Sequence, residues 1–271
     1  MKLAWLTDIH LDFLSLEAVE RFAAGIAATK ADAVAISGDI SNGPLLGTHL
    51  AILARVIPSP IYFVLGNHDF YQASLTRIAD EVRGLCERES RLIWLRDAGV
   101  VRLAEDVALI GHDGWYDGRH GSYWKTNVAL NDFHLIEELR GKHGHDRLRL
   151  MQSLADEGAA YLETVLQDAM AACRRIVVVT HVPPFPACAT YQGRPSDENW
   201  LPFFCCRSIG DVLRKAAAAR PDREVLVLCG HSHGGSDVEI LPNLRVRTGE
   251  AEYRRPAVQD VIDFGNPTEA T

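Results

Sequence analysis

Several features that define other protein classes are missing from this chain of 271 residues. No apolar run approaches the roughly 18 residues that a membrane-spanning helix needs. Met1 leads directly into the apolar segment LAWLT, without a charged n-region or a cleavage site. No repeat of fixed period and no low-complexity segment is present. We therefore expect a cytoplasmic protein with no membrane partner.

Cysteine is sparse, with six residues at irregular spacing and no CxxC pair. In a chain of this length, such spacing argues against a disulfide framework and indicates reduced thiols. The adjacent Cys205 and Cys206 leave two interpretations open, namely a redox pair or two thiols packed at a loop-to-helix junction.

Positive charge is also in short supply, because 28 Lys and Arg stand against 36 Asp and Glu, which gives a formal charge of -8. This balance argues against broad binding to a nucleic-acid backbone, which relies on clustered Lys and Arg. It leaves room for a local basic groove. Nucleic acid is therefore not the favoured partner.

Apolar periodicity predicts an α/β protein, with strands and helices alternating through the first half of the chain. The expected strands are Lys2 to Thr7, Ala33 to Ser37, Ile61 to Leu65, Leu92 to Leu95, Val100 to Leu103, Val107 to Ile110, Arg175 to Thr180, Glu224 to Cys229 and a final strand Leu244 to Thr248. The expected helices are Ser15 to Lys30, Leu45 to Val56, Ser74 to Glu89, Asp146 to Ala172 and Ile209 to Ala219. The three short strands between residues 92 and 110 suggest a meander or a sheet extension.

We expect one domain over residues 1–271, with loop-rich insertions near residues 112–144 and 183–208. Loops on a rigid scaffold commonly carry substrate contacts, so we assign both insertions to recognition as a hypothesis. Trp115, Tyr116 and Trp124 in the first insertion either stack on an organic group or pack the loop onto the body. The tail after Asp263 has the weakest tendency to order.

Five short polar motifs each follow a predicted strand: DIH at Asp8, GDISN at Gly38, GNHD at Gly66, THVPP at Thr180 and GHSH at Gly230. Strand ends in α/β folds meet in a shared crevice, so these side chains can converge there. Carboxylate, amide and imidazole groups are suitable ligands for transition metals.

The motifs differ in how specific they are. GNHD would arise by chance on the order of one time in a thousand, whereas an HxH pair alone is expected roughly 0.4 times in such a chain. His143 and His145 form such a pair in GKHGHD, with no strand before them, and we expect a solvated loop there.

The ordered series DxH, GD, GNHD, THxPP and GHxH resembles the calcineurin-like metallophosphoesterase superfamily, and its motifs span Asp8 to His233. One departure is the position of Gly43, one residue earlier than in the commonest GDxxxxG form. The resemblance implies a four-layer αββα sandwich of two mixed β-sheets flanked by helices, with the metal site at the carboxyl ends of the strands.

The same resemblance implies a ligand set for two metal ions per chain. Asp8, His10 and His233 would bind one ion, and Asn67, His181 and His231 the other. Asp39 would bridge them. Mixed oxygen and nitrogen ligands favour Mn or Fe and also suit Zn, Co or Ni.

The implied activity is hydrolysis of a small phosphomonoester or phosphodiester by in-line attack of a metal-bound hydroxide. The resemblance assigns the position of His68 to protonation of the leaving group or stabilisation of the transition state. Asp69, its neighbour, is expected to act with it by orienting the imidazole through a carboxylate hydrogen bond.

Two other functions compete with this one. A nuclease acting on DNA or RNA is disfavoured by the acidic balance and by the absence of an evident additional DNA-binding domain. A non-catalytic, protein-binding scaffold of the same fold would be expected to lose ligands, and this sequence keeps them. The natural substrate and the oligomeric state are not written in the motifs.

Overall fold

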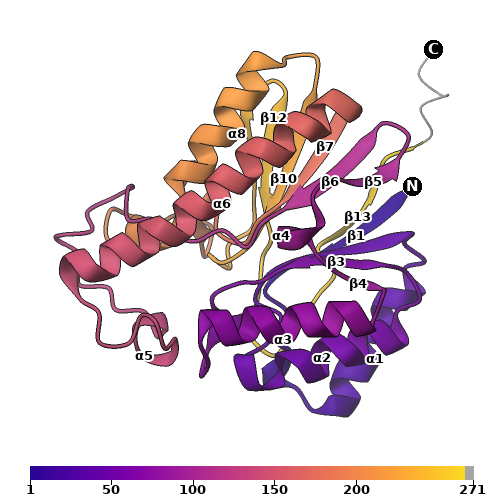
Figure 1. The fold of residues 1–271 in the computed structure, drawn as a ribbon, viewed down its shortest axis with the longest axis horizontal. Helices are drawn as coiled ribbons and strands as arrows, with labels where there is room; N and C mark the ends of the chain where they lie inside the picture. The colour runs from indigo at the N-terminus through magenta and orange to yellow at the C-terminus, as the bar shows by residue number, and fades with distance from the viewer. Residues whose placement is uncertain (266–271) are drawn as a thin grey trace.

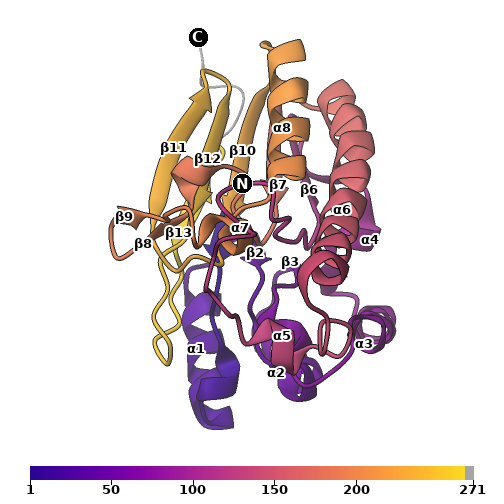
Figure 2. The same ribbon diagram turned by 90° about the vertical axis from the view of Figure 1, so that its left-hand side faces the viewer.

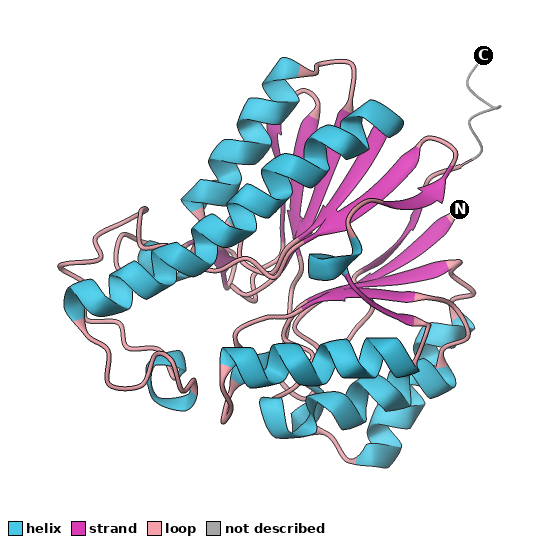
Figure 3. Cartoon of the chain, viewed as in Figure 1, coloured by secondary structure: helices cyan, strands magenta, loops and turns pink. Residues whose placement is uncertain are grey.

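Two β-sheets lie face to face between two layers of helices in the computed structural model, which describes residues 1–265 (Figures 1 and 3). The expected four-layer arrangement of two mixed sheets flanked by helices is thereby confirmed. No helix among the described residues is long and apolar enough to cross a membrane. Most of the tail after Asp263, residues 266–271, lies outside the described residues.

The first sheet has the strand order β13-β1-β2-β3-β4. Its parallel strands are β1 (Lys2–Leu6), β2 (Ala33–Ser37), β3 (Ile61–Val64) and β4 (Leu92–Trp94), and β13 (Asp260–Asp263) runs antiparallel to β1. Its outer face is covered by α1 (Leu16–Ala28), α2 (Gly43–Val56) and α3 (Leu75–Arg88). These helices begin at Ser15, Asn42 and Ser74, whose side chains accept hydrogen bonds from the first turn.

The second sheet has the order β11-β12-β10-β7-β6-β5. Its strands are β5 (Val101–Ala104), β6 (Val107–Gly111), β7 (Arg175–Val179), β10 (Glu224–Cys229), β11 (Ser236–Leu241) and β12 (Leu244–Thr248). The central four run parallel, and both edge strands, β5 and β11, are antiparallel to their neighbours. The long helix α6 (Gly144–Ala172) and α8 (Arg207–Ala219) cover the outer face (Figure 1).

Short elements fill the connections. They are the 3-10 helices Leu11–Phe13, His68–Phe70 and Pro186–Cys188, the helices α4 (Leu95–Ala98), α5 (Asp132–Leu135) and α7 (Leu201–Phe204), and the hairpin strands β8 (Thr190–Tyr191) and β9 (Arg194–Pro195). The hairpin joins the loop after β10 through a bridge between Thr190 and Gly234 (Figure 2).

The hydrophobic core has two parts. One lies between the two sheets, and the other lies between the sheets and the helices that cover them. Leu3 and Trp5 pack between the sheets with residues such as Val177, whereas Ala4 and Leu6 pack under the helices. Because both faces of the parallel strands are buried, these strands read as continuous apolar runs in the sequence.

Of the two alternatives for the segment 92–110, the structure favours sheet extension over a meander, because β4 extends the first sheet while β5 and β6 lie at the edge of the second. The prediction that Leu244–Thr248 is the final strand is wrong, since β13 follows it and pairs with β1. That the chain forms one domain stays a prediction.

Candidate metal centre

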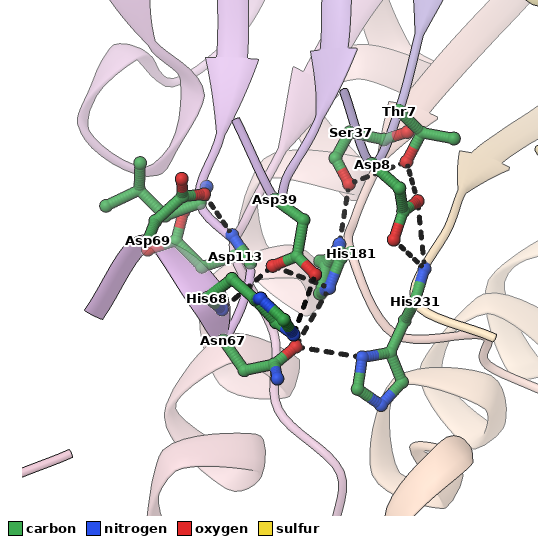
Figure 4. A network of polar contacts seen from close by, with 12 residues as sticks. Thr7, Asp8, Ser37, Asp39, Asn67, His68, Asp69, Asp113, His181 and His231 are labelled. Atoms are coloured by element: carbon green, nitrogen blue, oxygen red, sulfur yellow. Dashed lines mark hydrogen bonds and ion pairs between the residues drawn. The ribbon is translucent and has the colours of Figure 1, made fainter. Parts of the chain in front are cut away.

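The metal ligands predicted from the sequence come together where the central parallel strands end, and Figure 4 labels Asp8, Asp39, Asn67, His181 and His231 among them. Asp8 and His10 follow β1, Asp39 follows β2, and Asn67 follows β3. From the second sheet, His181 follows β7, and His231 and His233 follow β10. The site therefore lies between the two sheets and draws on both.

The backbone at this site is unusual. Five of the predicted ligands have a positive φ angle: Asp8 at 48°, His10 at 39°, Asp39 at 51°, His231 at 69° and His233 at 58°. Residues other than glycine adopt this left-handed region at a cost of about 1–3 kcal/mol each, so the surrounding structure must hold them there. The amide of Asp8 donates to Gly38 O at 3.0 Å, and that of His10 to Asp39 O at 3.0 Å.

The glycines of the motifs permit a close approach between the loops. A Cβ atom on Gly66 would collide with Asp39 Oδ1 and would lie 2.6 Å from His181 Nε2. A Cβ on Gly230 would collide with the side chains of Thr7 and Asp8. The GN and GH motifs therefore need glycine because the ligand side chains occupy that space.

The first group of ligand atoms belongs to Asp8, His10, Asp39 and His233, and all of these atoms lie within 4.8 Å of one another. His10 Nε2 and His233 Nε2 are 3.2 Å apart. His233 Nε2 lies 3.4 Å from Asp8 Oδ1, and His10 Nε2 lies 3.8 Å from Asp39 Oδ2. Imidazole nitrogens and carboxylate oxygens that face one point form a donor set suited to a transition metal.

The second group surrounds the side-chain oxygen of Asn67. His231 Nδ1 lies 2.9 Å and His181 Nε2 lies 3.2 Å from Asn67 Oδ1. His181 Nε2 is also 3.3 Å from Asp39 Oδ1. The two oxygens of Asp39 thus point to different groups, as a bridging carboxylate requires.

Hydrogen bonds behind the ligands fix which atoms point inward. His181 Nδ1 donates to Ser37 O at 2.8 Å, and His231 Nε2 donates to Phe203 O at 2.8 Å. In each ring this bond directs the other nitrogen, Nε2 of His181 and Nδ1 of His231, toward Asn67 Oδ1 and thus toward the second group. The donor set and its supports therefore fit the implied metal pair.

Asp132 orients Asn67 from the first insertion. It is buried, and its carboxylate accepts hydrogen bonds from Asn67 Nδ2 at 3.0 Å, Tyr71 OH at 2.7 Å and Tyr116 OH at 2.7 Å. Because Nδ2 is held by Asp132, Oδ1 of Asn67 turns toward His181 and His231. Sequence reasoning missed Asp132, which lies in no motif.

Electrostatics keeps several of the predicted ligands in the protonation state that a metal ion would need. Burial lowers the pKa of His10 and of His231 to about 4, so both are neutral at physiological pH. Burial alone would raise the pKa of Asp8, but the hydrogen bond with His233 and the nearby His181 outweigh it and lower that pKa to about 2.

The pKa of His181 is shifted in the opposite direction, upward, in the metal-free protein. Burial opposes its charge, yet the Asp39 carboxylate raises the pKa of His181 to about 10. A metal ion must therefore displace a proton from this ring, which couples metal binding to proton release.

His68 stands at the opening of the site. Its side chain is 18% exposed, and Nε2 lies 4.0 Å from Asp39 Oδ2. The ring stacks on Tyr71 with centroids 4.2 Å apart and an interplanar angle of 27°. The backbone amide of His68 donates to Asp39 Oδ1 at 2.9 Å, so the predicted catalytic residue is fixed to the predicted bridging ligand.

The structure corrects the expected hydrogen bond between Asp69 and His68. Asp69 Oδ1 accepts from the amide of Ser41 and Oδ2 from the amide of Gly66, both at 2.8 Å. The buried carboxylate therefore ties the loop after β2 to the loop after β3. Burial and, next, the charge of Asp39 raise the pKa of Asp69 well above its usual value. A catalytic part for Asp69 stays a prediction.

Trp115, Tyr116 and three histidines outside the motifs take structural or surface positions. Trp115 and Tyr116 are buried, so these side chains pack the first insertion onto the body of the protein and do not stack on a substrate. His112 is buried, and its Nδ1 accepts a hydrogen bond from the amide of Gly114. His143 and His145 are exposed, as expected, but they stand at the start of α6 and not in a loop.

Several proteins of known structure share this fold. The chain resembles the phosphopantetheinyl hydrolase PptH of Mycobacterium tuberculosis, with a TM-score of 0.72 and 16% identity, covering 100% of this chain and 98% of that one. A dimetal phosphatase of Danio rerio gives a TM-score of 0.57 at 14% identity, with 92% of this chain and 87% of that one covered. The protein TT1561 of Thermus thermophilus gives a TM-score of 0.55 at 14% identity, with 92% and 88% covered.

At these identities the likeness shows a shared fold. No curated protein matches the sequence. The sequence does match the calcineurin-like phosphoesterase family over residues 1–235. Because this match covers most of the 271 residues, the chain belongs to the calcineurin-like phosphoesterases and is a metal-dependent phosphoric ester hydrolase.

Proposed function

We propose that the chain hydrolyses a small phosphomonoester or phosphodiester by in-line displacement at phosphorus. The observation that carries the proposal is the pair of ligand groups that share Asp39, with the partly exposed His68 beside them. Asp8, His10 and His233 would hold one ion, Asn67, His181 and His231 the other, and Asp39 both. Two such ions would supply Lewis acidity, which would polarise the phosphoryl oxygens and lower the pKa of water so that hydroxide is available as the nucleophile at neutral pH.

The protein contributes ionised carboxylates that the strand-end loops hold in fixed positions. The carboxylates of Asp8 and Asp39 are ionised, since the pKa of Asp8 is lowered to about 2 and that of Asp39 well below its usual value. The strained strand-end loops hold these groups before any ion arrives. Such preorganisation places the ligand atoms without a further cost at the moment of reaction.

His68 supplies the proton that the leaving oxygen needs. Its Nε2 is directed toward Asp39, and the Tyr71 ring beneath it restricts the imidazole to one orientation. Partial exposure lets the ring exchange its proton with solvent between turnovers. A positioned general acid of this kind contributes roughly 10²- to 10⁴-fold to a rate.

The proposal extends to the metal and the substrate class. We expect Mn or Fe in the site, with Zn, Co and Ni as alternatives, because the ligand set mixes carboxylate oxygens with imidazole nitrogens. The solved relative that covers nearly the full length of both chains is described as a phosphopantetheinyl hydrolase, so phosphopantetheine esters belong in a substrate screen. The screen also includes aryl monoesters, diesters, cyclic nucleotides and dinucleoside polyphosphates.

The role of His68 is tested with His68→Ala on two aryl phosphates, p-nitrophenyl phosphate with a good leaving group and phenyl phosphate with a poor one. We expect kcat for phenyl phosphate to fall by roughly 10²-fold or more, and kcat for p-nitrophenyl phosphate to fall much less. Elemental analysis should find about two metal ions per chain in both proteins.

His134→Ala is the matched control, because His134 is an exposed histidine outside the ligand groups. Equal losses on both esters, together with a parallel loss of metal, would show that His68 only supports the site. Consistent absence of metal from protein prepared without chelator would contradict the dinuclear site itself.

A further inference from the structure

One tyrosine outside the five motifs borders the first group of ligands. Tyr253 belongs to the segment between β12 and β13, and its ring centroid lies 4.6 Å from that of His10 and 5.0 Å from that of His233. The ring of His68 is 6.3 Å away. Tyr253 is therefore next to two predicted metal ligands and close to the predicted general acid.

The segment that carries Tyr253 is fixed to the site by hydrogen bonds. The amide of Gly249 donates to Cys229 O at 2.9 Å, and the amide of Ala251 donates to His233 O at 3.3 Å. Gln259 closes the segment, because its Oε1 accepts from the amide of Glu250 at 3.0 Å and its Nε2 donates to Glu250 O at 2.9 Å. The end of β10 and the loop that follows it thus hold the start of this segment, and Gln259 ties the end of the segment back to Glu250.

Tyr253 and its neighbour Phe13 keep much of their surface in water. Tyr253 is 45% exposed and Phe13 43% exposed, and their ring centroids are 5.1 Å apart. Phe13 comes from the 3-10 helix directly after His10. These two adjacent rings present apolar surface to water beside a buried polar site, and covering that surface with a ligand is favourable.

We propose that Tyr253 and Phe13 form an aromatic platform that receives a flat ring in the organic part of the substrate. This inference rests on the proposed phosphoesterase function. Phosphate esters whose alcohol carries an aromatic or heteroaromatic ring near the phosphate are then preferred over esters of purely aliphatic alcohols. Stacking tolerates different rings, because every aromatic system offers a flat π-face.

A pair of substrates with the same leaving oxygen isolates this effect. Adenosine 5′-monophosphate and methyl β-ribofuranoside 5-phosphate share a primary 5′-alcohol and differ in the base. We expect the wild type, loaded with Mn²⁺, to favour the nucleotide about tenfold in kcat/KM, since one stacked base contributes an effect of this order. Tyr253→Ala should remove the preference by slowing the nucleotide alone, and Tyr253→Phe should keep it.

Tyr62→Ala is the matched control, because Tyr62 is a half-buried tyrosine near the start of β3, outside both insertions and away from the strand ends that carry the predicted ligands. It should behave like the wild type. Equal loss on both substrates in Tyr253→Ala would overturn the platform and show that Tyr253 supports the metal ligands. Equal kcat/KM of the wild type for both substrates would overturn it as well.

Binding of adenosine gives a second readout that does not require hydrolysis. In saturation-transfer difference NMR we expect signals from the base protons with the wild type and with Tyr253→Phe, and their loss with Tyr253→Ala. If adenosine binds in this way while neither phosphate is hydrolysed, the platform stands and the proposed function fails. If both phosphates are hydrolysed and no base contact is seen, the platform alone is wrong.

Discussion

Replacing Asp132 with Asn tests whether a residue that touches no ion controls the second group of ligands. The buried carboxylate accepts from Asn67, Tyr71 and Tyr116, and the new amide cannot accept at its nitrogen. Because Asn67 and Tyr71 donate to Oδ1 and Tyr116 donates to Oδ2, the amide nitrogen deprives either the first two groups or Tyr116 of an acceptor. Either loss weakens the network that keeps the oxygen of Asn67 turned toward His181 and His231. Residues behind metal ligands typically account for 10- to 100-fold in affinity, so we expect roughly this loss, or about 1.4–2.7 kcal/mol, for one of two ions.

Equilibrium dialysis against increasing free Mn²⁺, followed by elemental analysis, measures this loss. The wild type should saturate at two ions, whereas Asp132→Asn should bind the first ion normally and the second roughly 10- to 100-fold more weakly. Asp117→Asn is the control, because Asp117 is equally buried and accepts from the backbone amides of Arg119 and Ser208, away from the ligands. The reasoning is refuted if Asp132→Asn binds both ions like the wild type, or if Asp117→Asn weakens the second ion equally.

Two further predictions concern buried groups outside the metal centre. Burial lowers the pKa of His112 to about 3, so the unfolded state, with a pKa near 6.5, takes up a proton first as the pH falls. Chemical unfolding should show that the free energy of unfolding of the wild type falls by about 1.7 kcal/mol more than that of His112→Asn between pH 6.5 and 5, and parallel pH profiles would contradict this. The second prediction concerns the thiols, since burial raises the pKa of Cys206 to about 12 and Cys205 is equally inaccessible. Native protein mixed with a thiol reagent should react first at the half-buried Cys86, with the other thiols following only on unfolding, and rapid labelling of Cys205 and Cys206 would instead favour a redox pair.

Much of the fold could be predicted because its central strands are buried on both faces and its helices carry clear periodicity. The edge strands were harder to predict. β11 alternates half-buried and exposed residues over only six positions, and β13 has four residues. Neither segment shows in its own sequence which strand it joins, because pairing depends on what the rest of the chain leaves open.

In the candidate site, too, some residues could be predicted from the sequence and others could not. Predicted ligands such as Asp39 and His181 lie in short motifs at strand ends, where the local sequence determines both the residue and its place. Asp132 and Tyr253 lie in connecting segments, and their position depends on how those segments return to the site. Asp69 shows a further limit, because adjacency to His68 predicted a contact that the turn of the backbone directs elsewhere.

The pairing of β13 with β1 has a consequence for the order in which the protein can assemble. Lys2 at the start of the chain pairs with Asp263. During synthesis, β1 and the other parallel strands of the first sheet leave the ribosome long before this partner exists. One side of β1 therefore stays open as an edge that could pair with another chain, until the last described strand emerges and covers it.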